Sequence, residues 1–279
     1  MNRRLTMKDQ LSDVLSYILY FRNKECKYLS DLAKFLELKS IMRNNLLTTF
    51  FQPIIDLENG SIFGYEALNR PPSSRSFAST EKFYDYIGKT NQVFLFDLLC
   101  RNQAISKFYE SVHDKAWCNE RFLFINIHPQ VLMDSDYKSG ETTKLLRELD
   151  IPPKQVIFEI TEKQAVTDYV LFEKVLSHYR SQGFRIAVDD AGSGFNSLKA
   201  IVHLKPEILK LDRSLIHNIT QSNEQQKMTK LLLDFAIESG TKIVAEGIEQ
   251  QEDLNYLREL GIHYGQGYKL GRPSELITS

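Results

Sequence analysis

The sequence predicts an α/β barrel, because helix–glycine–strand units repeat along the chain and the strands end in acids or amides. A helical run from Asp168 stops at Gly183, one from Gln225 to Ser239 stops at Gly240, and one from Glu252 to Leu260 stops at Gly261. Glycine suits a helix C-terminus because it adopts positive φ without strain. An apolar strand follows each glycine, and such units form parallel sheets that close into a barrel or wind into an open sheet.

The first strand, Thr48 to Leu57, favours the barrel over an open dinucleotide-binding sheet. Such a sheet has a glycine-rich turn after its first strand. Here the hairpin-like turn Glu58-Asn59-Gly60 follows instead, and it predicts that the first two strands are antiparallel. The length of 279 residues suits one large core, since α/β barrels commonly run to about 250 residues.

The chain before about Leu47 has a different pattern. Apolar residues recur at helical spacing on either side of the polar stretch 23–27, namely Leu11, Val14, Leu15, Ile18 and Leu19, and then Leu29, Leu32, Phe35 and Leu36. We therefore expect a helical segment over residues 1–46 and a barrel over 47–279. A helical arm packed on the barrel is favoured over a sensory or partner-binding role.

Composition excludes several classes of protein. A net charge of −1 offers no basic excess for a nucleic-acid polymer, so a nucleotide ligand would be small. No apolar run is long enough to span a bilayer, and no signal-peptide core follows the basic start, which predicts a cytoplasmic protein. Cys26, Cys100 and Cys118 are odd in number and lack CxxC spacing, as expected of buried thiols in a reducing compartment.

Polar residues at the ends of the predicted strands indicate a metal site. Parallel barrel strands finish at one face, so Glu66, Asn126, Glu159 and Asp189 should converge there. Carboxylates gathered in this way repel one another unless a cation joins them. Oxygen ligands favour magnesium or manganese over zinc. In the adjacent pair Asp189-Asp190 the first could bridge two ions and the second bind one, although an Asx turn is the structural alternative.

Two further residues belong with this group. Lys210 lies in the otherwise apolar strand Ile208-Leu209-Lys210-Leu211, so a position among the acids is favoured over a surface lysine. Near a metal-bound water it could hold or deprotonate the nucleophile. Glu162 falls in the loop beyond Glu159, and we expect it to orient a ligand without binding the metal itself.

Taken in order, these residues resemble the EAL-domain family of cyclic-di-GMP phosphodiesterases from about residue 48 to the end. The motifs that carry the resemblance are Phe51-Gln52-Pro53-Ile54, Glu66-Ala67-Leu68 with Arg70, Asn126, Glu159-Ile160-Thr161-Glu162, Asp189-Asp190-Ala191-Gly192-Ser193-Gly194, Lys210-Leu211-Asp212, Ala245-Glu246-Gly247-Ile248-Glu249 and Gln266-Gly267-Tyr268. The resemblance implies a modified TIM barrel with an antiparallel first strand. It also implies a homodimer that hydrolyses cyclic di-GMP to linear pGpG with two magnesium or manganese ions, lowering a messenger that controls biofilm formation or motility.

The resemblance also assigns roles to residues. One metal would be held by Glu66, Asn126, Glu159 and Asp189, and the second by Asp189, Asp190 and Glu246. The predicted catalytic residues are Lys210, Glu66, Asp190 and Glu246. The predicted substrate-binding residues are Gln52, Leu68, Arg70, Asp212, Glu249 and Gln266.

One departure from the family pattern bears on activity. The family usually has Phe after the paired aspartates and Tyr three residues past the first glycine of that loop, where this chain has Ala191 and Phe195. The alternative function is therefore a weak or inactive cyclic-di-GMP-binding effector. A third possibility, a barrel enzyme that uses a metal and Lys210 to abstract a proton next to a carboxylate, requires neither the adjacent aspartates nor Arg70.

Overall fold

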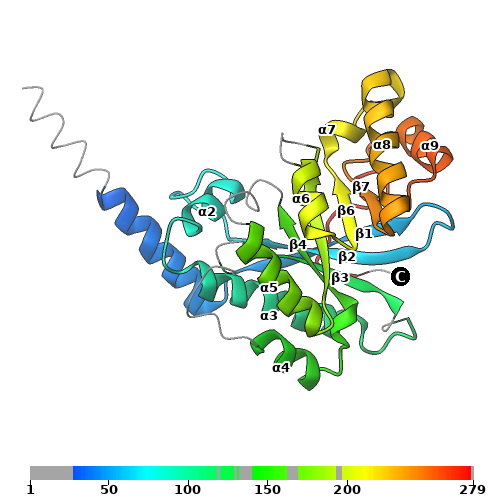
Figure 1. The fold of residues 1–279 in the computed structure, drawn as a ribbon. Coiled ribbons are helices and arrows are strands. Elements are labelled where there is room, and N and C mark those ends of the chain that lie inside the picture. Colours follow the sequence, from blue (N-terminus) through cyan, green and yellow to red (C-terminus); the bar gives the residue numbers. More distant parts are fainter. Residues whose placement is uncertain are drawn as a thin grey trace, which may run out of the picture. The chain divides into compact units, whose positions relative to one another are not determined.

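The computed structural model describes residues 28–117, 120–128, 131, 140–161, 169–192 and 197–277. Eight strands in these ranges form a closed barrel in the order β1 to β8 (Figure 1), which confirms the predicted fold class. The strands are β1 (Thr48–Asp56), β2 (Ile62–Arg70), β3 (Phe122–Asn126), β4 (Val156–Thr161), β5 (Arg185–Ala191), β6 (Ile208–Leu211), β7 (Lys242–Ala245) and β8 (Tyr264–Gly265).

The first strand runs against its neighbours on both sides. β1 pairs antiparallel with β2 and also with β8, whereas the pairs from β2–β3 to β7–β8 are parallel. The turn between β1 and β2 is held by Asp56, whose Oδ1 accepts hydrogen bonds from the backbone N–H groups of Glu58 (2.9 Å) and Asn59 (3.2 Å). The antiparallel start predicted from this turn is confirmed.

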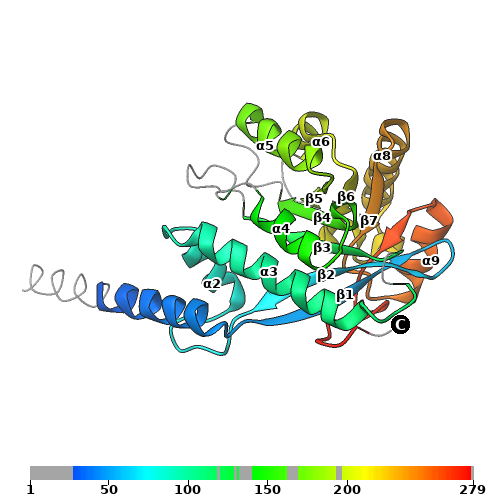
Figure 2. The same ribbon diagram turned by 90° about the horizontal axis from the view of Figure 1, so that it is seen from below.

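Helices connect the parallel strands on the outside of the barrel. α5 contacts β5 and α8 contacts β7, and Figure 2 shows α5, α6 and α8 outside β4 to β7. Gly240 ends α8 with a φ of 72°, as its place before a strand predicts. The helices are α2 (Thr80–Ile87), α3 (Val93–Val112), α4 (Glu141–Glu148), α5 (Tyr169–Ser181), α6 (Ser197–Leu204), α7 (Arg213–Ile216), α8 (Asn223–Ser239) and α9 (Gln251–Leu260), with 3-10 turns η3 (Pro153–Gln155) and η5 (Ile219–Gln221).

A layer of apolar side chains fills the barrel interior. Six strands each contribute one buried residue to it: Ile54, Phe124, Ile157, Ala187, Ile208 and Val244. Burying such side chains contributes about 1.5–3 kcal/mol each for the larger ones, so the layer is a substantial part of the core. The interior at this level is therefore packed and not open.

The chain divides into two compact units. The barrel unit comprises Thr48–Arg70 and Gly88–Ser279, and the other comprises Met1–Leu47 and Pro71–Ile87. In the second unit a helix spans residues 28–44, with Leu38 and Ile41 buried and Leu29 and Leu32 exposed. The rings of Phe77 and Phe83 pack edge to face at 5.0 Å.

Some expectations fall on residues outside the described ranges. The first of the two apolar runs with helical spacing, Leu11 to Leu19, falls in residues 1–27, and Cys26 and Cys118 are likewise outside the described ranges. Cys100 is described, and it is a buried cysteine on α3, as expected. Across the described ranges, no helix combines the length and apolar character that crossing a membrane requires.

Candidate active site

The polar side chains of the site form the layer of the barrel interior next to the apolar one. Side chains two positions apart on a strand point to the same face, so a residue two positions from a core residue also faces the interior. Because β1 is reversed, Gln52 precedes its core residue, Ile54, by two positions. In the parallel strands the polar residue follows the core residue: Asn126, Glu159, Asp189, Lys210 and Glu246 follow Phe124, Ile157, Ala187, Ile208 and Val244.

Lys210 is the cation at the centre of this layer. Its Nζ lies 2.7 Å from Oε1 of both Glu159 and Glu246, and 3.3 Å from Glu66 Oε2 and Asp189 Oδ1. Glu159 and Lys210 have no exposed surface. One ammonium group therefore contacts four carboxylates that come from four other parts of the barrel wall.

Two amides hold the carboxylate of Glu66. Gln266 Nε2 donates to Glu66 Oε2 at 2.7 Å and to Gln52 Oε1 at 3.2 Å. Asn126 Nδ2 donates to Glu66 Oε1 at 3.0 Å and to Glu159 Oε2 at 3.1 Å. Gln52 is held in turn by the backbone carbonyl of Gly271, to which its Nε2 donates at 3.1 Å. These contacts orient the carboxylates before any ligand binds.

Crowding of the acids changes their protonation. Burial raises the pKa of Glu246 to about 8, with Asp189 and Glu66 adding to the effect and Lys210 opposing it. Burial and the neighbouring Glu66 hold the pKa of Glu159 well above its usual value. The pKa of Asp189 is also raised, first by burial. These carboxyls therefore hold their protons to higher pH than carboxyls in water do.

Glu66 and Lys210 shift in the directions that favour their charged forms. Burial alone would raise the pKa of Glu66, but Lys210 and the hydrogen bonds from Gln266 and Asn126 outweigh it and lower the pKa. Burial would lower the pKa of Lys210, but the surrounding carboxylates hold it well above its usual value. Lys210 is therefore protonated at neutral pH in this arrangement.

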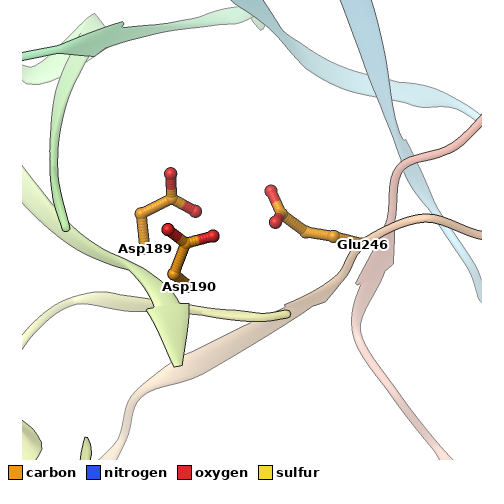
Figure 3. Close-up of side chains that lie close together, drawn as sticks. All are labelled: Asp189, Asp190 and Glu246. Carbon is orange, nitrogen blue, oxygen red and sulfur yellow. The ribbon is translucent and has the colours of Figure 1, made fainter. Parts of the chain in front are cut away.

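The donor set fits divalent cations. Asp189, Asp190 and Glu246 each offer a carboxylate oxygen within 4.8 Å of the other two, and Figure 3 shows Glu246 pointing toward the paired aspartates. Within the described ranges no donor is aligned for a hydrogen bond with Glu159 Oε1 or Asp189 Oδ1, although Lys210 Nζ lies close to both. Clustered oxygen ligands with raised pKa values suit magnesium or manganese.

A cavity of about 450 Å³ opens beside the acids. It is lined by five of the six predicted substrate-binding residues, namely Gln52, Leu68, Arg70, Glu249 and Gln266. The acids Glu66, Asp189 and Glu246 also line it. Asp212 is not among its lining residues. It caps α7 instead, where its Oδ1 accepts a hydrogen bond from the backbone N–H of Ser214 at 3.0 Å.

Sequence reasoning missed two side chains of the cavity, Arg213 and Tyr268. Arg213 Nη2 lies 3.2 Å from Glu249 Oε1. Gly247 leaves room for Arg213, because a Cβ at position 247 would collide with the Arg213 side chain. The φ of Gly247 is 69°, which also favours glycine. The ring of Tyr268 packs under the guanidinium of Arg272 at 4.3 Å. The position of Arg213 directly after the Lys210-Leu211-Asp212 motif was the available sequence signal.

The loops beyond β4 and β5 are described only in part. Glu162 and Phe195 lie outside the described residues. Ala191 is fully buried at the end of β5, and its carbonyl accepts a hydrogen bond from the backbone N–H of Asp212 at 3.0 Å. Asp190 has a φ of 58°, a left-handed conformation that aspartate tolerates better than most residues.

The fold and site define the class: an α/β barrel with an antiparallel first strand and, at the carboxyl ends of its strands, a set of acids that could hold a metal ion. A family model described as the EAL domain matches residues 36–273. The chain belongs to the EAL domain family.

Relatives with curated names include two phosphodiesterases. The chain is 31% identical over 239 residues to the probable cyclic di-GMP phosphodiesterase PdeB of Escherichia coli K12, covering 83% of this chain and 43% of the relative. It is 30% identical over 228 residues to the cyclic di-GMP phosphodiesterase PA2567 of Pseudomonas aeruginosa, covering 80% and 38%. The chain thus spans less than half the length of these relatives.

Solved structures resemble the chain as a whole. The EAL enzyme Bd1971, in a form with cAMP and cyclic di-GMP bound, superimposes with a TM-score of 0.80 at 25% identity, covering 97% of this chain and 74% of that one. A standalone EAL protein from Vibrio cholerae O395, with cyclic di-GMP bound, gives a TM-score of 0.73 at 29% identity, covering 84% and 94%.

Proposed function

We propose that the barrel hydrolyses cyclic di-GMP to linear pGpG with two magnesium or manganese ions. The observation that carries the proposal is the cluster of five carboxylates, four of them in contact with Lys210, beside a cavity lined by Arg70 and Arg213. The names of PdeB and PA2567, and the cyclic di-GMP bound in the Bd1971 and Vibrio cholerae structures, support the same substrate.

The acids divide into two sets of metal ligands that share Asp189. Asp189, Asp190 and Glu246 would hold one ion, and Glu66, Asn126, Glu159 and Asp189 the other. Asn126 would bind through Oδ1, which requires its amide to turn, because Nδ2 now faces both glutamates. When bound, such ions neutralise phosphoryl charge and supply a nucleophile at neutral pH.

The protein's own groups would bind and orient the substrate. The guanidinium groups of Arg70 and Arg213 line the cavity and can hold phosphate oxygens through their planar, charged donors. Lys210, protonated and fixed by four carboxylates, serves as a hydrogen-bond donor and positive charge. In the metal-free site this charge state suits holding the nucleophile, whereas deprotonating it would require bound cations to lower the pKa of Lys210.

Turnover of purified protein tests the proposal directly. Cyclic di-GMP is incubated with the protein and Mg²⁺ or Mn²⁺, and the nucleotides are separated by chromatography. We expect pGpG to accumulate only when a divalent ion is present. Binding of cyclic di-GMP without any pGpG, even with Mn²⁺ at alkaline pH, would instead identify the chain as an effector that binds the nucleotide.

Three further expectations stay predictions. The predicted division into a helical segment over 1–46 and a barrel over 47–279 is tested by expressing the barrel alone and measuring its unfolding transition.

The predicted homodimer is tested by measuring the sedimentation of the protein at several concentrations. The cytoplasmic location is tested by cell fractionation.

A further inference from the structure

A buried ion pair on α3 joins three elements of the barrel unit. Asp97 Oδ2 lies 2.8 Å from Arg101 Nε, and the two side chains are only 5% and 2% exposed. Arg101 Nη1 also donates to Thr142 Oγ1 of α4 at 3.1 Å. Thr142 is buried as well. Neither charged residue belongs to the acid cluster around Lys210.

The second oxygen of Asp97 holds the chain where it leaves strand β3. Asp97 Oδ1 accepts a hydrogen bond from the backbone N–H of His128 at 2.9 Å. One residue earlier the backbone still follows the sheet, since Ile127 N–H donates to the carbonyl of Glu159 at 3.0 Å. The backbone N–H of Ile127 therefore still bonds within the sheet, whereas that of His128 bonds to a side chain of α3.

Asn126 lies two residues before His128 and is more exposed than the other proposed metal ligands. Asn126 is an exposed residue, whereas Glu159 and Lys210 are fully buried. The amide nitrogen of Asn126 reaches Glu66 and Glu159 at 3.0 and 3.1 Å. A backbone shift of about 1 Å at this position would break contacts of that length, and such misplacements can cost about 100-fold in rate.

Stability alone does not account for a charged pair in this position. Two charges removed from water lose hydration that their attraction only partly returns, so a buried pair is weak evidence of stabilisation. In some proteins such a pair fixes one arrangement of the groups that it contacts. Here those groups are the N–H of His128 and the hydroxyl of Thr142, which tie α3 to the end of β3 and to α4.

We propose that Asp97, held by Arg101, is a positioning residue that fixes Asn126 for metal binding by anchoring the backbone at His128. The inference rests on the proposed function, because it takes Asn126 to be a metal ligand. Residues that orient metal ligands typically change metal affinity about 10–100-fold when they are replaced.

The chain offers a matched control in Glu207. This carboxylate also binds an arginine and a strand N–H: Arg180 Nε lies 2.8 Å from Oε1, and Ile186 N–H donates to Oε2 at 2.9 Å. Ile186 is the second residue of β5, at the end of the strand away from Asp189. The control pair is more exposed, at 39% for Glu207 and 27% for Arg180. It ties a helix to a strand without touching the site.

The experiment compares Mn²⁺ affinity in two double variants, Asp97→Leu/Arg101→Leu and Arg180→Leu/Glu207→Leu. Both remove the whole ion pair, so neither leaves a buried charge without its partner. Calorimetric titration with Mn²⁺, well below each Tm, is expected to show affinity about 10–100-fold weaker for the first variant. The control should stay within about 3-fold of wild type even where its Tm falls, since the positional effect is local. Equal losses in both variants, or wild-type affinity in the first, would overturn the proposal.

Two further measurements separate positioning from general loss of structure. Asn126→Ala is made in wild type and in the Asp97→Leu/Arg101→Leu background, where it should weaken Mn²⁺ binding much less, because both changes act on the same ligand. Full additivity would contradict the mechanism. If the double variant does not fold, Asp97→Asn, which keeps the shape of the side chain, is expected to lower affinity by a smaller factor, and unchanged affinity would overturn the proposal. Mn²⁺ binding is measured without substrate, so an absence of hydrolysis would count against the proposed function and not against this inference.

Discussion

Lys210 on β6 and Glu246 just beyond β7 form a buried ion pair in which Nζ lies 2.7 Å from Oε1. The same nitrogen is 2.7 Å from Glu159 Oε1 on β4, so Lys210 links acids from strands on both sides of β6. A single positive charge thus neutralises part of a cluster of five acids. Divalent cations would bind to the same carboxylates.

Replacing Lys210 should destabilise the metal-free protein. Lys210→Met keeps the length of the side chain but leaves buried carboxylates without their cation, and breaking such a pair typically costs about 3–5 kcal/mol. Thermal unfolding in EDTA should show a large fall in Tm, and Mn²⁺ should restore part of it because the ions bind only the folded state. Lys242→Met, at an exposed site on β7, is the control and should leave Tm nearly unchanged. A Tm for Lys210→Met equal to that of the control would contradict the prediction.

Metal affinity should increase with pH up to and beyond about 8. Glu246 has a pKa of about 8, and the pKa values of Glu159 and Asp189 are also raised, so metal binding must displace protons from these groups near neutral pH. Calorimetry in buffers of different ionisation enthalpy should detect this proton release. Affinity that is constant between pH 6 and pH 9 would show that these carboxyls are already ionised in the metal-free protein.

The raised pKa of Glu246 also determines how the stability of the metal-free protein changes with pH. The pKa of Glu246 is raised on folding, so its favourable contribution is complete below the unfolded value of about 4.3 and is lost as the pH rises toward about 8. Glu159 and Asp189 act in the same direction. We therefore expect the Tm increase produced by Mn²⁺ to be larger at pH 8 than at pH 5.5. A smaller increase at pH 8 would mean that other groups control the response.

Asp190→Asn should abolish turnover and leave the fold intact. Asp190 has a φ of 58°, and asparagine tolerates this conformation as aspartate does, so the backbone should not change. Loss of one carboxylate from the group of Asp189, Asp190 and Glu246 should lower kcat at least about 100-fold. Circular dichroism checks the fold. Full activity in this variant would remove the support for two-metal catalysis.

Arg213→Ala should weaken substrate binding more than it slows chemistry. Arg213 lines the cavity but does not contact the acids around Lys210 in any described ion pair, so we expect KM to increase about 10-fold with kcat within about 3-fold of wild type. Arg258→Ala on the exposed surface of α9 is the control. A fall in kcat with unchanged KM would place Arg213 in the chemical step.

The barrel and most of its acids could be predicted because both depend on short-range periodicity. Helix–glycine–strand units identify the parallel strands, and polar residues two positions from Phe124, Ile157 and Ala187 identify the interior face of three of them. The same spacing applies to Lys210 after Ile208. Residues separated by two positions on a strand share a face wherever the strand lies in the sequence.

Long-range contacts account for what could not be predicted. Arg213 reaches Glu249 from a different strand–helix connection, and Asp97 on α3 meets His128, 31 residues away. Segment 71–87 belongs to the same compact unit as the N-terminal helix, and its start, Pro71-Pro72-Ser73-Ser74, indicates a loop but not this partner. Such contacts arise from how the elements pack, and no period in the sequence encodes them.

The reversed direction of β1 has a consequence for how the barrel is connected to the rest of the chain. Gln52 of β1 lies beside Glu66 of β2, and four residues further toward the same rim Thr48 pairs with Arg70. The chain therefore both enters β1 and leaves β2 at the rim that carries the acids. In an all-parallel barrel the entrance would lie at the opposite end. Insertion or deletion of residues between Leu47 and Thr48 would therefore act on Gln52, which lines the cavity beside the acids. Only the short stretch of β1 from Thr48 to Gln52 separates the two positions.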